Sequence, residues 1–347
     1  MTHKERVYSA LRHEPADIIP RFVWFGNGIL SRMREKEGLD PLDVDLKFGN
    51  DVLQTWVSMN GEMARDVPDG STFTDEWGIT WQRESFDNTA IIHPMAGLST
   101  DEIKAYPLPD PKSPERFKHL EYLKSKFGST HFIGADVSSS LFDPACHLRG
   151  MEEFMVDLAS QSEEAEILLD RLEEFNIELS IECIKRGADW IWLGDDVGSQ
   201  RAMLISPEMW RESIKPRMER IILEIRKHSD DVFIAYHSCG SIRPIISDLV
   251  QIGIEVLNPI QESACDMNQN EIKNEFGEQI TLMCGVDTQS FLPTASPDEI
   301  KRVVAEKIET LGRGGGYIFA ASHTIQHDTP EENISALFTA LDDTSTL

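Results

Sequence analysis

The feature that most constrains this chain is a regular alternation of short apolar runs and helical segments from about residue 130 onward. A short apolar run bounded by turn residues is typical of a buried strand, and the segments between the runs have helical periodicity. Strands that alternate with helices predict parallel strands joined by right-handed crossovers. Together with two earlier runs, eight strands are expected, at 18–24, 51–57, 131–137, 189–194, 232–237, 254–259, 280–284 and 316–320.

Eight strand-and-helix units in 347 residues predict an α/β protein built as a single (β/α)8 TIM barrel over residues 1–347. We expect an N-terminal extension, and a small β-hairpin insertion at 72–83, where apolar and polar residues alternate around Gly78. A doubly wound open sheet is the alternative. No glycine-rich phosphate loop follows the early strands, which weighs against that alternative.

Local chemistry marks the ends of two helices. Thr2 and Glu5 have the spacing of a capping box, which predicts a helix directly after residue 2. The segment 163–186 has helical periodicity and stops before Gly187, a residue suited to the position just beyond a helix. These signals add detail to the alternating pattern without changing the predicted fold.

The charge and the cysteines restrict the partners and the compartment. The 60 Asp and Glu outnumber the 33 Lys and Arg, for a formal net charge of −27. That field repels phosphate backbones and anionic lipids, so neither nucleic acid nor a membrane surface is an expected partner. No apolar stretch approaches 18 residues, the N-terminus has no signal-peptide core, and the five cysteines are scattered. We therefore expect a cytoplasmic protein in a reducing compartment.

One predicted strand ends in two residues that suit a metal. The strand 232–237 runs into His237-Ser238-Cys239-Gly240. Side chains at i and i+2 of a strand point to the same face, so His237 and Cys239 can converge. Imidazole and thiolate are ligands that suit Zn²⁺. A buried cysteine beside a hydrogen-bonded histidine is the alternative interpretation of this pair.

Two more strand ends contribute possible ligands. Cys284 closes one predicted strand, and His323 follows the last one. In a βα barrel the carboxyl ends of the strands meet at one face, where active sites lie. We therefore predict that His237, Cys239, Cys284 and His323 form a metal site. For Cys284 the alternative is a small residue packed in the core.

Polar residues near other strand ends are candidates for catalysis or substrate binding. Asp195 and Asp196 follow the strand 189–194, where they can bind substrate, orient a ligand histidine or act as a general base. Their alternative role is to cap a turn or face solvent. For two of the candidate substrate-binding residues, Asn258 and Gln261, the alternative is turn chemistry. The candidate substrate-binding residues are Asn27, Gln200, Asn258 and Gln261.

The segments that carry these residues resemble the uroporphyrinogen decarboxylase superfamily. The similarity runs over most of the chain and is densest in DWIWLGDDVGSQ, YHSCGSIRPIISDLVQIGIEVLNPIQ, CGVDTQ and GGGYIFAASHTIQHDTPEEN. The opening stretch RVYSALRHEPADIIP is also similar to the start of that family. The resemblance implies a single (β/α)8 barrel, in agreement with the strand count.

This superfamily has two branches with different chemistry. The decarboxylases need no metal and hold a polycarboxylated tetrapyrrole with an arginine-rich segment of the form RQAGR, where this chain has VWFGNG at 23–28. The other branch consists of zinc methyltransferases that work with a corrinoid protein. They carry H-x-C at the strand matching 232–237 and a third ligand, often Cys, near the end of the last strand. His237 and Cys239 match that pair, and His323 stands where Cys is commoner.

The resemblance implies a zinc-dependent methyltransferase that moves a methyl group between a small methylated substrate and a corrinoid protein. The methyl-corrinoid or cob(I)alamin is then supplied by that partner. Two histidines and fewer thiolates make zinc a stronger Lewis acid, which favours demethylation of a donor such as a methyl ether. The alternatives are a metal-free decarboxylase of the uroporphyrinogen type and a non-catalytic docking barrel. The methyl donor or acceptor, the corrinoid partner and the oligomeric state stay open.

Overall fold

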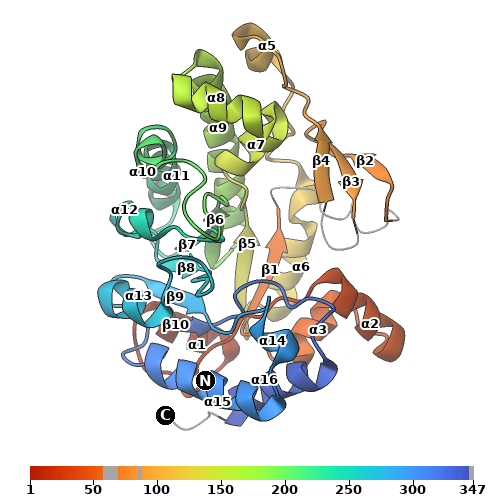
Figure 1. The fold of residues 1–347 in the computed structure, drawn as a ribbon, viewed down its shortest axis with the longest axis vertical. Helices are drawn as coiled ribbons and strands as arrows, with labels where there is room; N and C mark the ends of the chain where they lie inside the picture. Colours follow the sequence, from red (N-terminus) through yellow and green to blue (C-terminus); the bar gives the residue numbers. More distant parts are fainter. Residues whose placement is uncertain (58–68, 85–87, 344–347) are drawn as a thin grey trace.

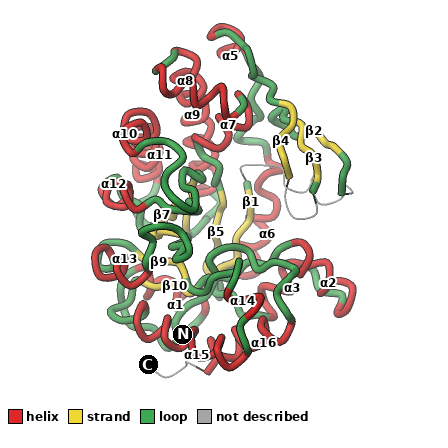
Figure 2. Tube along the Cα trace, viewed as in Figure 1, coloured by secondary structure: helices red, strands yellow, loops and turns green. Residues whose placement is uncertain are grey.

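The computed structural model describes residues 1–57, 69–84 and 88–343. Seven parallel strands form one curled sheet in the order β1-β5-β6-β7-β8-β9-β10, as in a TIM barrel. Helices surround these strands on the outside (Figure 1, Figure 2). The strands are β1 (Val52–Trp56), β5 (Phe132–Asp136), β6 (Trp190–Gly194), β7 (Phe233–His237), β8 (Val256–Asn258), β9 (Thr281–Cys284) and β10 (Tyr317–Phe319). Each of the seven lies within a run that the apolar pattern predicts.

The helices connect the strands and cover their outer face. The capping box of Thr2 and Glu5 and the helix predicted over 163–186 are both confirmed. None of the helices described combines the length and the apolar character that a membrane span requires. The helices are α1 (His3–Leu11), α2 (Asn27–Glu37), α3 (Pro41–Lys47), α5 (Thr100–Ala105), η1 (Pro114–Phe117), α6 (Lys118–Phe127), α7 (Phe142–Arg149), α8 (Met151–Ser160), α9 (Glu163–Lys185), α10 (Pro207–Met209), η2 (Trp210–Ile214), α11 (Lys215–His228), η3 (Arg243–Ile245), α12 (Ile246–Gln251), α13 (Gln269–Phe276), α14 (Phe291–Thr294), α15 (Pro297–Leu311) and α16 (Glu331–Asp343).

The segment 18–24, predicted as an eighth strand, does not form a regular strand. It lies between the edge strands β10 and β1, where Phe22 N donates to Phe319 O at 2.9 Å and Asp51 N donates to Arg21 O at 2.8 Å. The ladder toward β1 stops there, because the amide of Asn50 occupies both backbone groups of Val23. A side chain thus replaces the neighbouring backbone, and only isolated bridges remain.

A separate antiparallel sheet lies beside the barrel, to the right in Figure 1. It contains β2 (Thr72–Thr74), β3 (Thr80–Arg83) and β4 (Asn88–Ile92) in that order. The segment predicted as a hairpin, 72–83, holds β2 and β3, which pair antiparallel. At the turn between them, the Asp75 carboxylate accepts hydrogen bonds from Ile79 N and from the indole of Trp81.

The two faces of the barrel strands form two different apolar clusters. Residues alternate along a strand between inward and outward positions. The outward residues pack under the helices, whereas the inward ones fill the barrel with Val52, Phe132, Trp190, Trp192, Ala235, Val256, Met283 and Ile318. The same alternation places Asp136, Gly194, His237 and Asn258 on the inward face at the carboxyl ends of their strands.

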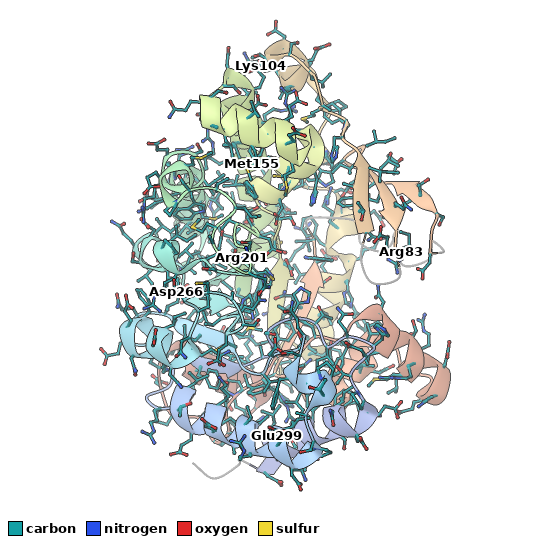
Figure 3. The ribbon with its side chains drawn as sticks, viewed as in Figure 1. Arg83, Lys104, Met155, Arg201, Asp266 and Glu299 are labelled. Atoms are coloured by element: carbon teal, nitrogen blue, oxygen red, sulfur yellow. The ribbon has the colours of Figure 1, made fainter. Side chains whose placement is uncertain are left out.

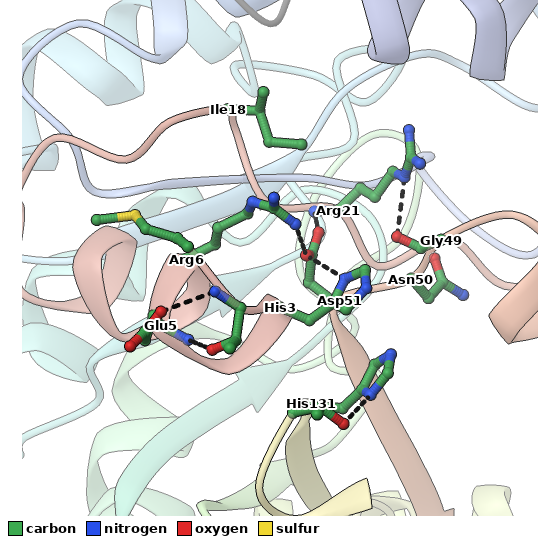
Figure 4. Close-up of polar contacts among 12 residues, drawn as sticks. His3, Glu5, Arg6, Ile18, Arg21, Gly49, Asn50, Asp51 and His131 are labelled. Carbon is green, nitrogen blue, oxygen red and sulfur yellow. Dashed lines mark hydrogen bonds and ion pairs between the residues drawn. The ribbon is translucent and has the colours of Figure 1, made fainter.

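Helix α1 closes the opposite end of the barrel through a network of charged groups (Figure 4). His3 Nδ1 lies 2.8 Å from Asp51 Oδ1, and Arg6 also contacts that carboxylate. The ring of His3 stacks on His131 with centroids 4.2 Å apart. Lys4 Nζ donates to Asp189 at 2.8 Å. Ion pairs therefore close this end of the barrel, and the candidate site residues lie at the other end.

The histidine at the sealed end predicts a loss of stability in acid. Burial, reinforced by the charge of His3, lowers the pKa of His131 to about 4, whereas an unfolded histidine titrates near 6.5. The unfolded chain therefore binds more protons, and stability falls as pH is lowered from about 6.5 toward 4. Urea unfolding at several pH values measures this slope. The variant His131→Asn should show a shallower slope, and an unchanged slope would contradict this assignment.

Candidate metal and active site

His237 lies at the carboxyl end of β7 and faces the barrel interior. The indoles of Trp24 and Trp192 flank its ring, each with a centroid distance of 6.2 Å. On the neighbouring strand β6, a Cβ at Gly194 would lie 2.5 Å from His237 O and 2.8 Å from His237 Cβ. Only glycine therefore allows β6 to approach this histidine so closely.

The hydrogen bonds of Asn258 determine which nitrogen of His237 is available. Asn258 Nδ2 donates to Met283 O at 3.0 Å, so its Oδ1 must be the acceptor for His237 Nδ1 at 2.7 Å. His237 therefore carries its proton on Nδ1, and Nε2 presents a free lone pair. A ligand histidine held in one tautomer by an oxygen at its second nitrogen is the usual arrangement around protein-bound metals.

Three donor atoms converge on the mouth of the barrel. Cys239 Sγ lies 3.5 Å from His237 Nε2, which confirms that these two side chains point the same way. Asp196 Oδ1 lies 3.7 Å from His237 Nε2 and accepts a 2.7 Å hydrogen bond from Cys239 N. One ligand atom of each residue lies within 4.8 Å of those of the other two. Asp196 is the most accessible, with 49% of its side chain exposed.

The electrostatics of this cluster favour a cation. Burial, with the charge of Asp196, raises the pKa of the Cys239 thiol well above its usual range. Burial also raises the pKa of Asp143, next to Asp196, to about 7. A bound divalent ion reverses both effects, because it stabilises thiolate and carboxylate together.

The geometry of the cluster fits Zn²⁺. Zinc binds His nitrogen at about 2.0–2.1 Å and Cys sulfur at about 2.3 Å, so tetrahedral ligands of these types lie roughly 3.5 Å apart. The distance between His237 Nε2 and Cys239 Sγ is 3.5 Å. Three protein ligands with one open position are typical of catalytic zinc, whereas structural zinc takes four. Asp196, His237 and Cys239 supply three donors of suitable chemistry.

Comparison with known proteins identifies the family. The profile of a family described as "Uroporphyrinogen decarboxylase (URO-D)" matches residues 2–344. The chain belongs to the uroporphyrinogen decarboxylase family. A Methylcobamide:CoM methyltransferase, MtbA of Methanosarcina mazei, is 24% identical over 344 residues, covering 97% of this chain and 96% of the relative. The uroporphyrinogen decarboxylase of Coxiella burnetii is 25% identical over 181 residues, covering 50% and 46%.

A solved structure has the same fold as this chain. The structure described as "methyltransferase from Methanosarcina mazei" superimposes with a TM-score of 0.75 and 20% sequence identity, covering 100% of both chains. At that identity the similarity concerns the fold alone. The relatives of this chain carry two different named activities, and the site residues must distinguish them.

Cys284 and His323, the other two predicted metal ligands, lie outside the cluster. In the strand β9 the inward residue is Met283, so Cys284 faces outward, is fully buried and packs with the outer apolar cluster. His323 is exposed in the bend after β10. Beyond that bend, Ile325 forms an isolated bridge with Phe25. Among the described residues, the group that can share an ion contains neither Cys284 nor His323.

The predicted catalytic residue Asp195 has a position different from that of Asp196. It is fully buried, and its carboxylate accepts hydrogen bonds from Leu141 N at 2.9 Å and from Asp143 N at 3.1 Å, at the start of α7. Burial, with the charge of Asp143, raises the pKa of Asp195 well above its usual range. Asp195 therefore fixes the loop after β5, whereas Asp196 lies beside His237 and Cys239.

The predicted substrate-binding residues also differ in position. Gln261 Oε1 accepts from Gly240 N at 2.8 Å, so Gln261 holds the turn after Cys239. Gln200 is exposed in the loop after β6, and Asn27 is exposed at the start of α2. The loops after β6 and β8, where Figure 3 labels Arg201 and Asp266, meet where Cys265 N donates to Gln200 O at 3.0 Å. Of the four predicted residues, only Gln261 and Asn258 form hydrogen bonds, within the described part of the chain, to the segment 237–240 that contains His237 and Cys239.

Sequence reasoning missed Asp136 at the end of β5. Its carboxylate accepts from Gln54 Nε2 at 2.7 Å and from Ser138 N at 2.9 Å. The sequence does show an acidic residue, Asp136, within the predicted strand 131–137. Because the apolar run continues to Val137, Asp136 was not recognised as a polar residue at the end of the strand.

The role of Asn258 predicts an effect of its removal on metal affinity. In the variant Asn258→Leu, His237 Nδ1 loses its acceptor, and both the tautomer and the ring orientation are released. We expect zinc affinity to fall by about 10–100-fold, measured by competition with a chelator of known affinity. The variant Gln261→Leu removes a comparable buried amide contact at Gly240 without touching His237, so it should retain more of that affinity. Equal affinities of the two variants would contradict the role of Asn258.

Proposed function

We propose that this protein is a zinc-dependent methyltransferase that transfers a methyl group between a small methylated substrate and the corrinoid of a partner protein. The observation that carries this proposal is the 3.5 Å separation of His237 Nε2 and Cys239 Sγ, with Asp196 beside them. Support for the reaction comes from the full-length relative named Methylcobamide:CoM methyltransferase.

The residues of the site have separate tasks in this proposal. His237, Cys239 and Asp196 hold the zinc, and Asn258 keeps the proton of His237 on Nδ1. Zinc, when bound, supplies Lewis acidity toward the heteroatom that carries or receives the methyl group. Trp24 and Trp192 border the site with apolar surface and limit access of water from the barrel interior.

The ligand set favours demethylation of a donor over methylation of a thiol. Asp196 supplies an oxygen ligand. A second thiolate in its place would donate more electron density to the zinc ion. A zinc ion with one thiolate is the stronger Lewis acid and better stabilises a departing oxygen or nitrogen. We therefore place methyl ethers among the candidate donors.

The test of this function combines metal analysis with methyl transfer. We expect about one zinc per chain in purified protein. We also expect methylation of cob(I)alamin from at least one donor among methoxylated aromatics, methanol, methylamines and methyl thiols. Turnover of uroporphyrinogen by metal-free protein would instead establish the decarboxylase alternative. Protein that binds no zinc and methylates no corrinoid would refute the proposal.

A further inference from the structure

Asp136 is a buried carboxylate at the mouth of the barrel, and it is not part of the group formed by Asp196, His237 and Cys239. It lies on the inward face of β5 and is 9% exposed. The inward direction is clear at Gly134, because a Cβ there would lie 2.3 Å from Trp190 Nε1 and 2.7 Å from Gln54 Oε1. Asp136 is two residues farther along the same face.

The orientation of Asp136 is set by a chain of hydrogen bonds. Trp190 Nε1 donates to Gln54 Oε1 at 2.7 Å, which leaves Gln54 Nε2 to donate to Asp136 Oδ2 at 2.7 Å. Ser138 N donates to the other oxygen at 2.9 Å. The carboxylate is therefore held in place by groups that cannot easily turn away.

These contacts leave Asp136 incompletely satisfied. A carboxylate has about four acceptor positions, and the hydrogen bonds from Gln54 and from the backbone and side chain of Ser138 use at most three of them. None of the ion pairs found within the described residues involves Asp136, in contrast to the buried Asp189, which contacts Lys4 and Lys124. Burying a carboxylate without a cation is costly, so this arrangement indicates a partner from outside the chain.

We propose that Asp136 is a substrate-binding residue that accepts a hydrogen bond from an O–H or N–H group of the methylated substrate. This inference rests on the proposed function and narrows its substrate class. A substrate that carries a hydroxyl or a protonated amine fits the carboxylate. A substrate with a negative charge at that point is repelled, because Asp136 is itself acidic.

The electrostatics of Asp136 are consistent with this role at neutral pH. Burial raises its pKa to about 6, while the hydrogen bonds from Ser138 and Gln54 and the charge of His237 act in the opposite direction. The carboxyl is therefore mainly ionised at pH 7 and becomes a weaker acceptor below pH 6. Binding of a donor-bearing substrate should weaken over the same pH range.

Pairs of substrates that differ by one donor group test the proposal. One pair is 2-methoxyphenol and 1,2-dimethoxybenzene, and the other is trimethylammonium and tetramethylammonium. Binding to full-length wild-type protein is measured by calorimetry, and methyl transfer to cob(I)alamin is measured alongside. The wild type should bind the donor-bearing member of at least one pair about 10–100-fold more tightly, the range for a hydrogen bond to a charged group.

The variant Asp136→Asn should remove this preference while keeping its zinc. Because its amide places one N–H against Gln54 or Ser138, some loss of stability is expected, so the measured quantity is the affinity ratio within each pair. A purely structural role would lower both affinities equally. The variant Asp189→Asn, a buried acid at the sealed end of the barrel, is the control that should preserve the ratio.

The outcomes separate this inference from the proposed function. A ratio that falls to near 1 in Asp136→Asn and stays unchanged in Asp189→Asn supports the role of Asp136. A wild-type protein without preference in either pair, including one that binds neither member, overturns it, as does an unchanged ratio in Asp136→Asn. Failure of the function shows itself differently, as wild-type protein that binds a donor but contains no zinc and transfers no methyl group.

Discussion

Replacing Cys239 by serine is expected to remove most of the bound zinc and to lower methyl transfer by more than about 100-fold. The reason is that Cys239 supplies the only sulfur among the three donors that converge at the barrel mouth. Removing a residue that forms a hydrogen bond to a metal ligand lowers metal affinity or activity by about 10–100-fold. Removing the ligand itself should therefore lower them further. Metal content by atomic emission and the rate of cob(I)alamin methylation measure the two effects.

The cysteine chemistry offers a matched control for this variant. Cys265 is exposed in the loop after β8, and Cys265→Ser should leave zinc content and activity within about twofold of wild type. Far-ultraviolet circular dichroism should be the same for both variants, because neither residue is in a strand. Full zinc content in Cys239→Ser would refute the proposed ligand set.

The substitution of Gly194 by alanine is expected to disable the site from a neighbouring strand. Its Cβ would lie 2.5 Å from His237 O and 2.9 Å from His237 N, and these backbone atoms cannot rotate away. The strands β6 and β7 must separate, which also strains the hydrogen bond from Asp195 N to His237 O. Overpacking of this kind costs about 1–3 kcal/mol, and the displaced imidazole should lose zinc. Urea denaturation and zinc titration measure the two losses.

A second glycine separates the loss of stability from the loss of metal. Gly285 follows β9, and a Cβ there would lie 2.2 Å from Ala320 O, again a backbone atom. The variant Gly285→Ala should therefore lower the free energy of unfolding to a similar extent. Because this clash involves neither β6 nor β7, zinc affinity should be largely kept. An equal loss of zinc in both variants would contradict the claim that Gly194 acts on the site through the position of His237.

The architecture was largely accessible from the sequence because its signals are local. Apolar runs of strand length separated by amphipathic helices predicted all seven strands of the curled sheet. The exception, 18–24, has the same apolar character as the others. There a long-range contact decided the outcome, since the amide of Asn50 satisfies the backbone of Val23 that a strand would have paired.

The candidate site was predictable only in part. His237 and Cys239 were paired correctly because the i and i+2 rule operates within one strand. For Asp196 the sequence left several roles open, and the fold places it beside His237 because β6 and β7 pair in register. Cys284 was assigned from its place at a strand end, and the outward direction of its side chain depends on a register that its own sequence does not reveal.

The sequence by itself determined which segments become strands and helices, and it paired His237 with Cys239, because hydrophobic periodicity and side-chain alternation act over a few residues. Only the tertiary structure decided which ends of different strands share a point in space. The tautomer of His237 depends on Asn258 in the next strand, and the orientation of Asp136 depends on Gln54 and Trp190 in the strands on either side of it. Such contacts between strands are set by barrel register and closure, which no single segment encodes.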